Sequence, residues 1–140
     1  MHKKKLALAA IAAMLAGCAT PPPAPPAAQR TLDEYKRVVA KRITDASRDT
    51  YSEPVPGMLK SIVVLEITLD KAGAPLEVAV YRTNGYEELS ARAIASVVDA
   101  APFAAPEAAL LRDDGSISFL ETFLFRDDDS FQLRSLVPAP

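Results

Sequence analysis

The sequence predicts an α+β fold in which two helices pack on a three-stranded antiparallel-type sheet, in the order helix, strand, strand, helix, strand. Two segments place apolar residues at helical spacing, which predicts amphipathic helices. Three other segments are rich in β-branched and aromatic residues, which favour strands. Gly, Pro and Asp clusters separate these segments and indicate turns. We expect one domain over residues 31–127, because a chain of this length supports a single core.

The N-terminus predicts a secretory signal peptide over residues 1–17. Lys3, Lys4 and Lys5 form a basic start, and residues 6–16 form an unbroken apolar run. The alternative is a transmembrane helix. The uncharged stretch over residues 6–20 has 15 residues, which is about 22 Å of helix at about 1.5 Å per residue. A bilayer core of about 30 Å needs more than that.

The segment Leu15-Ala16-Gly17-Cys18 resembles the bacterial lipobox. The resemblance implies a diacylglycerol on the Cys18 thiol, cleavage before Cys18 and acylation of the new amino terminus. Ala19 follows where Asp would retain a lipoprotein at the inner membrane, so the resemblance implies a lipid anchor in the outer membrane, on its periplasmic face. The alternative is an ordinary secreted protein in which Cys18 is incidental. Cys18 is the only cysteine of the chain, which excludes an internal disulfide.

Removal of residues 1–17 changes the charge of the chain. It leaves 13 basic and 18 acidic side chains, a net charge of −5, and no basic patch that would favour nucleic acid. Residues 18–30 then form a lipidated, Pro/Ala-rich linker. Five of the six residues at 21–26 are proline, which favours a semi-rigid polyproline II spacer.

A capping box opens the domain. Thr31 is the expected N-cap and Glu34 follows three residues later. The apolar spacing predicts a helix over residues 32–48, through Leu32, Tyr35, Val39, Ile43 and Ala46. Its outer face carries a basic stripe of Lys36, Arg37, Lys41 and Arg42. We interpret this stripe as a solvated face, with a docking surface as the alternative.

A hairpin follows. Residues 61–69 predict a strand that is apolar on both faces in its first half, which suits the centre of a sheet. Residues 70–75 supply the turn, with Gly73 where a positive φ is needed. Residues 76–81 alternate and pair back as the second strand. If the first strand is central, the second and third flank it and run parallel to each other. Both edges of the sheet are then available, and the third strand is the more hydrophobic edge and contains no proline.

The second helix is expected over residues 86–101, ended by Pro102. The loop over residues 102–115 contains a turn of helix near residues 108–111. Residues 117–126 predict the last strand, in which Glu121 interrupts the alternation, so we expect a bulge there or a side chain at an edge. We interpret Asp127, Asp128 and Asp129 as a solvated turn, because calcium-loop spacing is missing. Residues 128–140 are expected to be a flexible tail.

These pieces in this order resemble the TonB/TolA C-terminal domain family. The resemblance rests on an apolar strand, an acidic turn with Gly73 and a valine-rich strand. It continues with the turn Thr83-Asn84-Gly85, the Ala-rich helix that begins near Leu89-Ser90, and Pro102-Phe103-Ala104-Ala105-Pro106. It covers about residues 31–127. Ser90 stands where the family has Asp, and Ala104 and Ala105 replace two prolines. The chain has neither the motor-contacting helix nor the long linker of TonB and TolA, so force transduction is not carried over.

The resemblance implies that the domain binds an extended segment of a periplasmic or outer-membrane protein by strand addition. An edge strand presents unpaired N–H and C=O groups to such a segment. The predicted edge consists of Phe119, Leu120, Glu121, Thr122, Phe123, Leu124 and Phe125. The alternative interpretation is a scaffold lipoprotein that assembles an envelope or secretion complex through its helical face.

The sequence argues against an enzyme and predicts no cofactor, metal or catalytic residue. The only histidine is His2, inside the predicted signal peptide, and the only thiol is Cys18. No Gly-rich phosphate loop is present. Glu66 and Glu121 are the carboxylates on strands that could meet as a catalytic pair.

Overall fold

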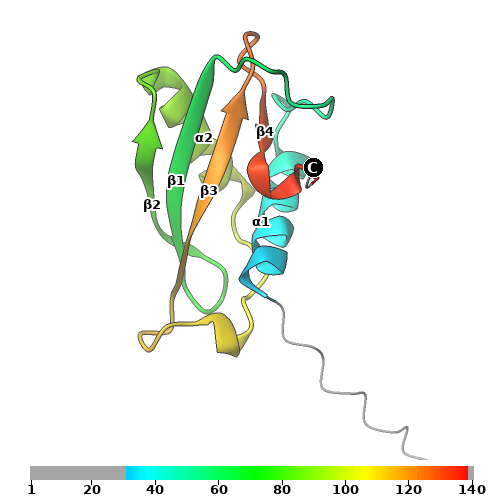
Figure 1. The fold of residues 1–140 in the computed structure, drawn as a ribbon. Coiled ribbons are helices and arrows are strands. Elements are labelled where there is room, and N and C mark those ends of the chain that lie inside the picture. The colour runs from blue at the N-terminus through cyan, green and yellow to red at the C-terminus, as the bar shows by residue number, and fades with distance from the viewer. Residues whose placement is uncertain (1–30, 139–140) are drawn as a thin grey trace, which may run out of the picture.

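A computed structural model describes residues 31–138 of the chain (Figure 1). The predicted signal peptide, Cys18 and the linker lie outside these residues. In order, the elements are α1 (Leu32–Ala46), β1 (Ser61–Leu69), β2 (Pro75–Thr83), α2 (Glu87–Ala100), the 3₁₀ turn η1 (Ala108–Leu110), β3 (Ile117–Phe125), β4 (Phe131–Leu133) and the 3₁₀ turn η2 (Arg134–Leu136). The predicted α+β class with two helices on an antiparallel sheet is confirmed.

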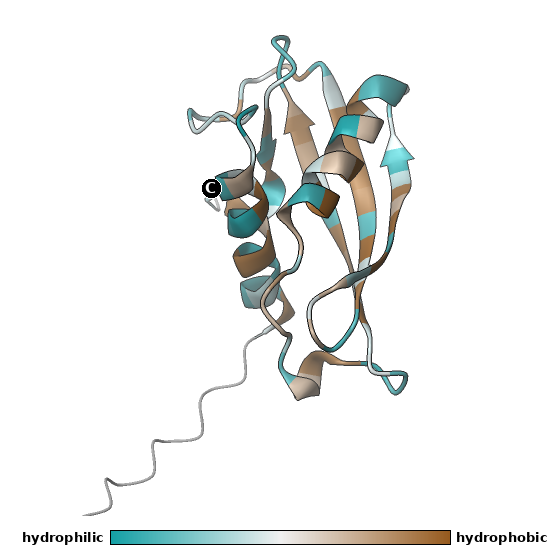
Figure 2. Ribbon diagram, turned by 180° about the vertical axis from the view of Figure 1, so that it is seen from behind, coloured by the Kyte–Doolittle hydropathy of each residue, from teal (hydrophilic) through white to brown (hydrophobic). Residues whose placement is uncertain are grey.

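The sheet has four strands in the order β2-β1-β3-β4. The strand β1 pairs antiparallel with both β2 and β3, as predicted for a central first strand. The prediction of three strands was wrong, because β4 pairs antiparallel with the end of β3. Both helices lie on the same face of the sheet (Figures 1 and 2), and no helix from residues 31–138 covers the opposite face.

The strand β4 exists because a tight turn returns the chain to β3. Arg126 N donates to Ser130 O at 2.9 Å, and Asp129 takes a positive φ of 65°. Beyond the turn, Phe131 and Leu133 alternate with Gln132 and are fully buried. The prediction of a flexible tail over residues 128–140 was therefore wrong for β4 and η2. Two inward apolar side chains give this segment the burial that a tail lacks.

The core lies between the helices and the inner face of the sheet. Thr31 Oγ1 accepts a hydrogen bond from Glu34 N at 3.2 Å, so the predicted N-cap of α1 is confirmed. The helix ends at Ala46, two residues before the predicted end. Its buried side chains meet those of β1, α2, β3 and β4. The largest of these side chains are Tyr35, Phe123, Phe125, Phe131, Ile43, Leu65, Ile67, Leu69, Leu89 and Leu133.

The β1–β2 hairpin packs against the loop that follows α2. Gly73 has a φ of 89°, which confirms the positive φ predicted for the turn, and its O accepts a hydrogen bond from Phe103 N at 3.0 Å. A Cβ at this position would collide with the backbone of Phe103. The side chain of Phe103 belongs to the core. The turn of helix predicted in this loop is present as η1.

The register between β1 and β3 is continuous from Ser61↔Phe125 to Leu69↔Ile117. The bulge or edge position predicted for Glu121 is therefore wrong. Glu121 pairs with the buried Leu65, so its side chain points into the domain, and it is 1% exposed. The Glu121 carboxylate points inward because the surrounding apolar residues fix the register of β3.

Candidate functional site: the edges of the sheet

The strand β3 is not a free edge over its last three residues. The predicted partner-binding residues are Phe119, Leu120, Glu121, Thr122, Phe123, Leu124 and Phe125, and the last three pair with β1 on one side and with β4 on the other. Phe119 and Phe123 are buried core residues. The premise that this strand offers bare backbone groups along its whole length was wrong. The cause is the short strand β4, which lies within the residues that the sequence pattern assigned to a flexible tail.

Next to the β4 ladder, η2 meets the outer side of β3 at Glu121, whereas residues 117–120 have a strand partner only in β1 among the described residues. Glu121 Oε1 accepts one hydrogen bond from its neighbour Thr122 N at 3.0 Å and another from Ser135 N at 3.3 Å. The carboxylate thus replaces a strand partner for Thr122 and holds η2 in place. Burial raises the pKa of Glu121, while hydrogen bonds from Ser135 and Thr122 and the charge of Lys36 oppose the rise. Its Oε2 is buried without a hydrogen-bond partner among residues 31–138.

The outer side of β4 is also paired. Tyr51 N donates to Phe131 O at 3.1 Å, and Phe131 N donates to Asp49 O at 2.9 Å, which makes a parallel bridge between Thr50 and Phe131. The Gln132 side chain donates to Tyr51 O at 3.1 Å. The segment after α1 therefore closes this end of the sheet.

Tyr51 reinforces the closed end. Its hydroxyl donates to Leu124 O at 3.1 Å, and the Arg126 guanidinium lies 4.1 Å from the centre of its ring. Burial raises the pKa of Tyr51, and the charge of Arg126 partly offsets that rise. These contacts tie the loop after α1 to β3.

The strand β2 is the opposite end of the sheet, and no other segment within residues 31–138 pairs with its outer side. Two register shifts leave Leu76 and Tyr81 without partners on β1, and both are 61% exposed. Between these irregularities, residues 77–80 pair regularly with β1. Alternate residues of an antiparallel strand direct their N–H and C=O groups away from the partner. This short regular stretch is a free edge at the β2 end of the sheet, within the described domain.

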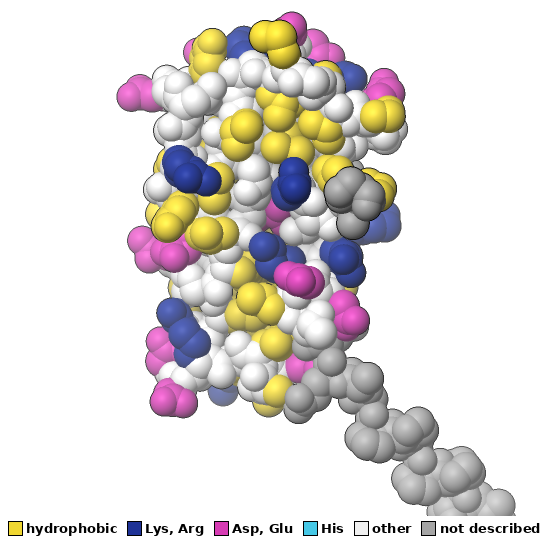
Figure 3. Space-filling model, in the orientation of Figure 1, with side chains coloured by type: hydrophobic (Ala, Val, Ile, Leu, Met, Phe, Trp, Pro, Cys, Tyr) yellow, Lys and Arg dark blue, Asp and Glu magenta, His cyan; other side chains and the backbone are white. Residues whose placement is uncertain are grey.

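An apolar groove accompanies that edge. It lies between β2 and α2 and is lined by Pro75, Leu76, Glu77, Val78, Ile94, Val98 and Ala101. We call it the β2–α2 groove. On the face that carries no helix, apolar side chains gather over part of the surface, with charged side chains around them (Figure 3). Ile62 is 44% exposed there, whereas Val64 and Leu124 are nearly buried.

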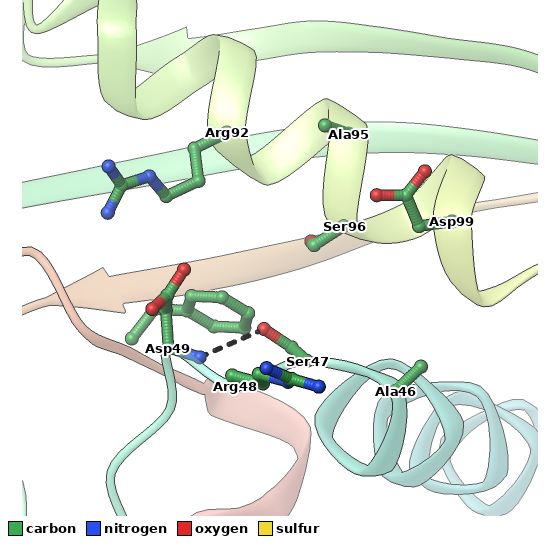
Figure 4. Close-up of a pocket in the computed structure, with 9 residues that line it drawn as sticks. Ala46, Ser47, Arg48, Asp49, Arg92, Ala95, Ser96 and Asp99 are labelled. Atoms are coloured by element: carbon green, nitrogen blue, oxygen red, sulfur yellow. Dashed lines mark hydrogen bonds between the residues drawn. The ribbon is translucent and has the colours of Figure 1, made fainter.

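A second pocket lies between the end of α1 and α2 (Figure 4). Arg48 and Asp49 contribute from the loop after α1, and Arg92 and Asp99 contribute from α2. Its two serine hydroxyls bind backbone groups. Ser47 Oγ accepts from Asp49 N at 3.3 Å, and Ser96 Oγ donates to Ala93 O at 2.7 Å. These are contacts of a helix end and a helix interior, and they do not form the nucleophile and base pair that acyl transfer requires.

The two strand carboxylates do not meet. Glu121 pairs with Leu65 and points inward, whereas Glu66 is exposed on the opposite face. Within residues 31–138, no cluster of three or more His, Cys, Asp or Glu side chains has the geometry of a metal site. Asp128 and Asp129 instead form the turn before β4, where they bind Arg126 and Lys60 respectively. None of the helices in this part of the chain has the length and apolar content needed to cross a bilayer.

No family model, curated protein or solved structure matches the chain. The sequence left both outer strands available as edges and placed the site on the last one, so the β2–α2 groove was not predicted. Two signals for the groove were present in the sequence. Leu76 and Val80 are apolar residues of the second predicted strand, and Val98 is an apolar residue of the second predicted helix.

Proposed function

We propose that this protein is a lipid-anchored lipoprotein of the outer membrane, on its periplasmic face, whose TonB/TolA-like domain binds a protein partner by strand addition. It has no motor-coupled force transduction of its own and no catalytic role. The lipobox-like segment ending at Cys18 supports the anchor. From α1 through β3, the helices and strands of the domain follow the helix, strand, strand, helix, strand order of the family that the sequence resembles.

The observation that carries the binding proposal is the unpaired outer side of β2. Residues 77–80 keep a regular register with β1, and no segment of the described chain lies on their other side. Backbone groups in this position gain hydrogen bonds when an extended segment is added. The bulges at Leu76 and Tyr81 confine the addition to a short stretch, which limits edge-to-edge association between copies.

A second candidate function is a scaffold that assembles an envelope or secretion complex through α1. A small apolar patch there consists of Val38 and Leu136, with Arg37 and Lys41 beside them. Val38 is 36% exposed. Apolar contact through a helical face would serve a folded partner rather than an extended one.

One crosslinking experiment separates the two candidates. A photoreactive amino acid replaces Tyr81 on β2 in one variant and Val38 on α1 in a matched variant, both expressed in the native envelope. Strand addition predicts crosslinks from position 81 to one short segment of a partner, mapped by mass spectrometry. Crosslinks only from position 38, onto a folded domain, would favour the scaffold and contradict the strand-addition proposal.

The anchor has a separate test. Cys18→Ser removes the thiol that would carry the lipid, so we expect an unprocessed precursor and loss of metabolic labelling with a radioactive fatty acid. Mature protein of normal size in this variant would contradict the lipoprotein assignment.

A further inference from the structure

The β2–α2 groove extends the apolar core to the surface beside β2, the strand at this end of the sheet. It has a volume of about 410 Å³. Val78 and Ile94 line it and also pack against the buried core cluster. Leu76 is 61% exposed, Val98 53% and Val80 40%. These apolar side chains stand where a further strand would cover them.

A strand added to β2 would direct every second side chain into this groove. Strand side chains alternate between the two faces of a sheet. Val78 and Val80 pair with the buried residues Ile67 and Leu65, so they lie on the helix side of the sheet. The side chains of an added strand on that side therefore meet Ile94 and Val98 of α2. Burial of apolar surface then adds to the backbone hydrogen bonds.

The opposite face of the same edge carries two carboxylates beside residues 77–80, and the exposed Arg82 lies beyond them, paired with Val64. Glu77 pairs with Thr68, and Glu66 pairs with Ala79, so the two carboxylates are diagonal neighbours on the outer face of adjacent strands. Both are exposed. Among residues 31–138, no Lys or Arg forms an ion pair with either of them. The outer side chains of an added strand would lie beside this pair.

We infer that the β2 edge accepts an extended segment that alternates apolar residues with Lys or Arg. The apolar residues enter the β2–α2 groove and the cations lie beside Glu66 and Glu77. This inference rests on the proposed function, because it names the chemistry of the partner segment that adds to β2. Opposite charges placed across neighbouring strands stabilise the pairing, and like charges oppose it.

Two other occupants fit the edge less well. The linker of the same chain has five prolines among residues 21–26, and proline has no N–H to donate to a strand. A second copy, paired antiparallel through β2, would place both copies of Glu77 on one face beside both copies of Glu66. Four carboxylates in that arrangement repel one another.

The test uses two synthetic peptides and the full-length protein in detergent. The first peptide alternates Val and Lys, and the second alternates Val and Glu. Fluorescence anisotropy should show that the Val-Lys peptide binds about tenfold more tightly than the Val-Glu peptide. A Val-Lys peptide with methylated backbone nitrogens should not bind, because it cannot pair with the edge.

Three variants connect the preference to named residues. Glu66→Lys with Glu77→Lys should reverse the preference between the two peptides. Asp113→Lys, at an exposed position in the loop before β3, is the matched control and should leave the preference unchanged. Val98→Asn should weaken binding of the Val-Lys peptide, because it removes an apolar side chain from the groove and leaves β2 unchanged.

The outcomes separate this inference from the proposed function. Equal binding of both peptides, lost on backbone methylation, would overturn the charge inference and leave strand addition standing. Binding of neither peptide would overturn the inference, while the crosslinks from position 81 would still decide strand addition independently. A homodimer by sedimentation that dissociates in the Val98→Asn variant would overturn it in favour of a second copy.

Discussion

The backbone nitrogen of Ser135 donates a hydrogen bond of 3.3 Å to Oε1 of Glu121. A buried carboxylate on β3 thereby fixes the 3₁₀ turn that follows β4. The same oxygen accepts the hydrogen bond of Thr122 N, which would otherwise be available to an added strand. The Glu121 side chain thus occupies the outer side of β3 next to the residues that pair with β4. The strand β2 lies at the other end of the sheet, and no described segment pairs with its outer side.

Replacement of Glu121 by Gln should alter the pH dependence of stability. Burial raises the pKa of Glu121 above 4.5, so its contribution to folding is full when the carboxyl is protonated. That contribution is lost as the pH rises from 4.5 through the raised pKa. Glu121→Gln keeps an acceptor oxygen for Thr122 and Ser135 but carries no charge. Urea unfolding across this pH range should show a decline in the wild type that the variant lacks.

A matched control is Glu77→Gln, because Glu77 is exposed. We expect it to retain the decline seen in the wild type. An identical decline in the wild type and in Glu121→Gln would contradict the assignment of this pH dependence to Glu121.

Phe131→Ala should destabilise the domain by about 3–5 kcal/mol, the usual cost of removing a buried aromatic side chain. Phe131 is fully buried, and its ring centre lies 5.1 Å from that of Phe123 and 5.6 Å from that of Phe125. Leu76→Ala, at a position that is 61% exposed, should change stability by no more than about 0.5 kcal/mol. Urea unfolding measures both. Equal effects of the two variants would mean that residues 131–136 do not belong to the folded domain.

Gly73→Ala should cost about 1–3 kcal/mol from its positive φ alone, with a further loss from the collision with the backbone of Phe103. Gly115→Ala is the matched control. Gly115 has a φ of 81°, close to the 89° of Gly73, but a Cβ there would meet nothing within 4 Å. The difference in unfolding free energy between the two variants therefore measures the close approach of the hairpin to the loop after α2. Equal losses of unfolding free energy in the two variants would show that the Phe103 backbone moves away from residue 73 at no cost.

The pKa of Asp128 should report on the hydrogen bonds of the turn before β4. Hydrogen bonds from Ser130 lower the pKa of Asp128 from 3.8 to about 2, and Arg126 contributes. The turn is therefore stabilised by ionised Asp128 above pH 3.8, and this stabilisation is lost as the pH falls through about 2. In Ser130→Ala, carboxyl-carbon NMR should place the pKa nearer 3.8. An unchanged pKa would exclude the hydrogen bond of the Ser130 hydroxyl as its cause, because the backbone N–H of residue 130 still donates to Asp128 in this variant.

Much of the fold is determined by patterns that act over a few residues. The cap at Thr31, the positive φ of Gly73 and the end of α2 before Pro102 each depend on local backbone chemistry, so the sequence predicted them. The long strands β1 and β3 were predicted for a related reason. Each has enough β-branched or aromatic residues to predict a strand, and the start and end of β1 agree with the structure.

The edges of the sheet were decided by the tertiary structure. The three-residue strand β4 is too short to show a period, and it forms because Phe131 and Leu133 find buried positions beside β3. Its outer side is closed by Asp49 and Tyr51, which are about 80 residues away in the chain. Whether a backbone group of an edge strand is hydrogen-bonded depends on segments that are distant in the sequence, and a local sequence pattern does not predict their position. The sequence by itself determined the three long strands and left both outer ones available as edges. Only the packed domain added β4, which covers the end of β3 and leaves β2 at the unpaired end of the sheet.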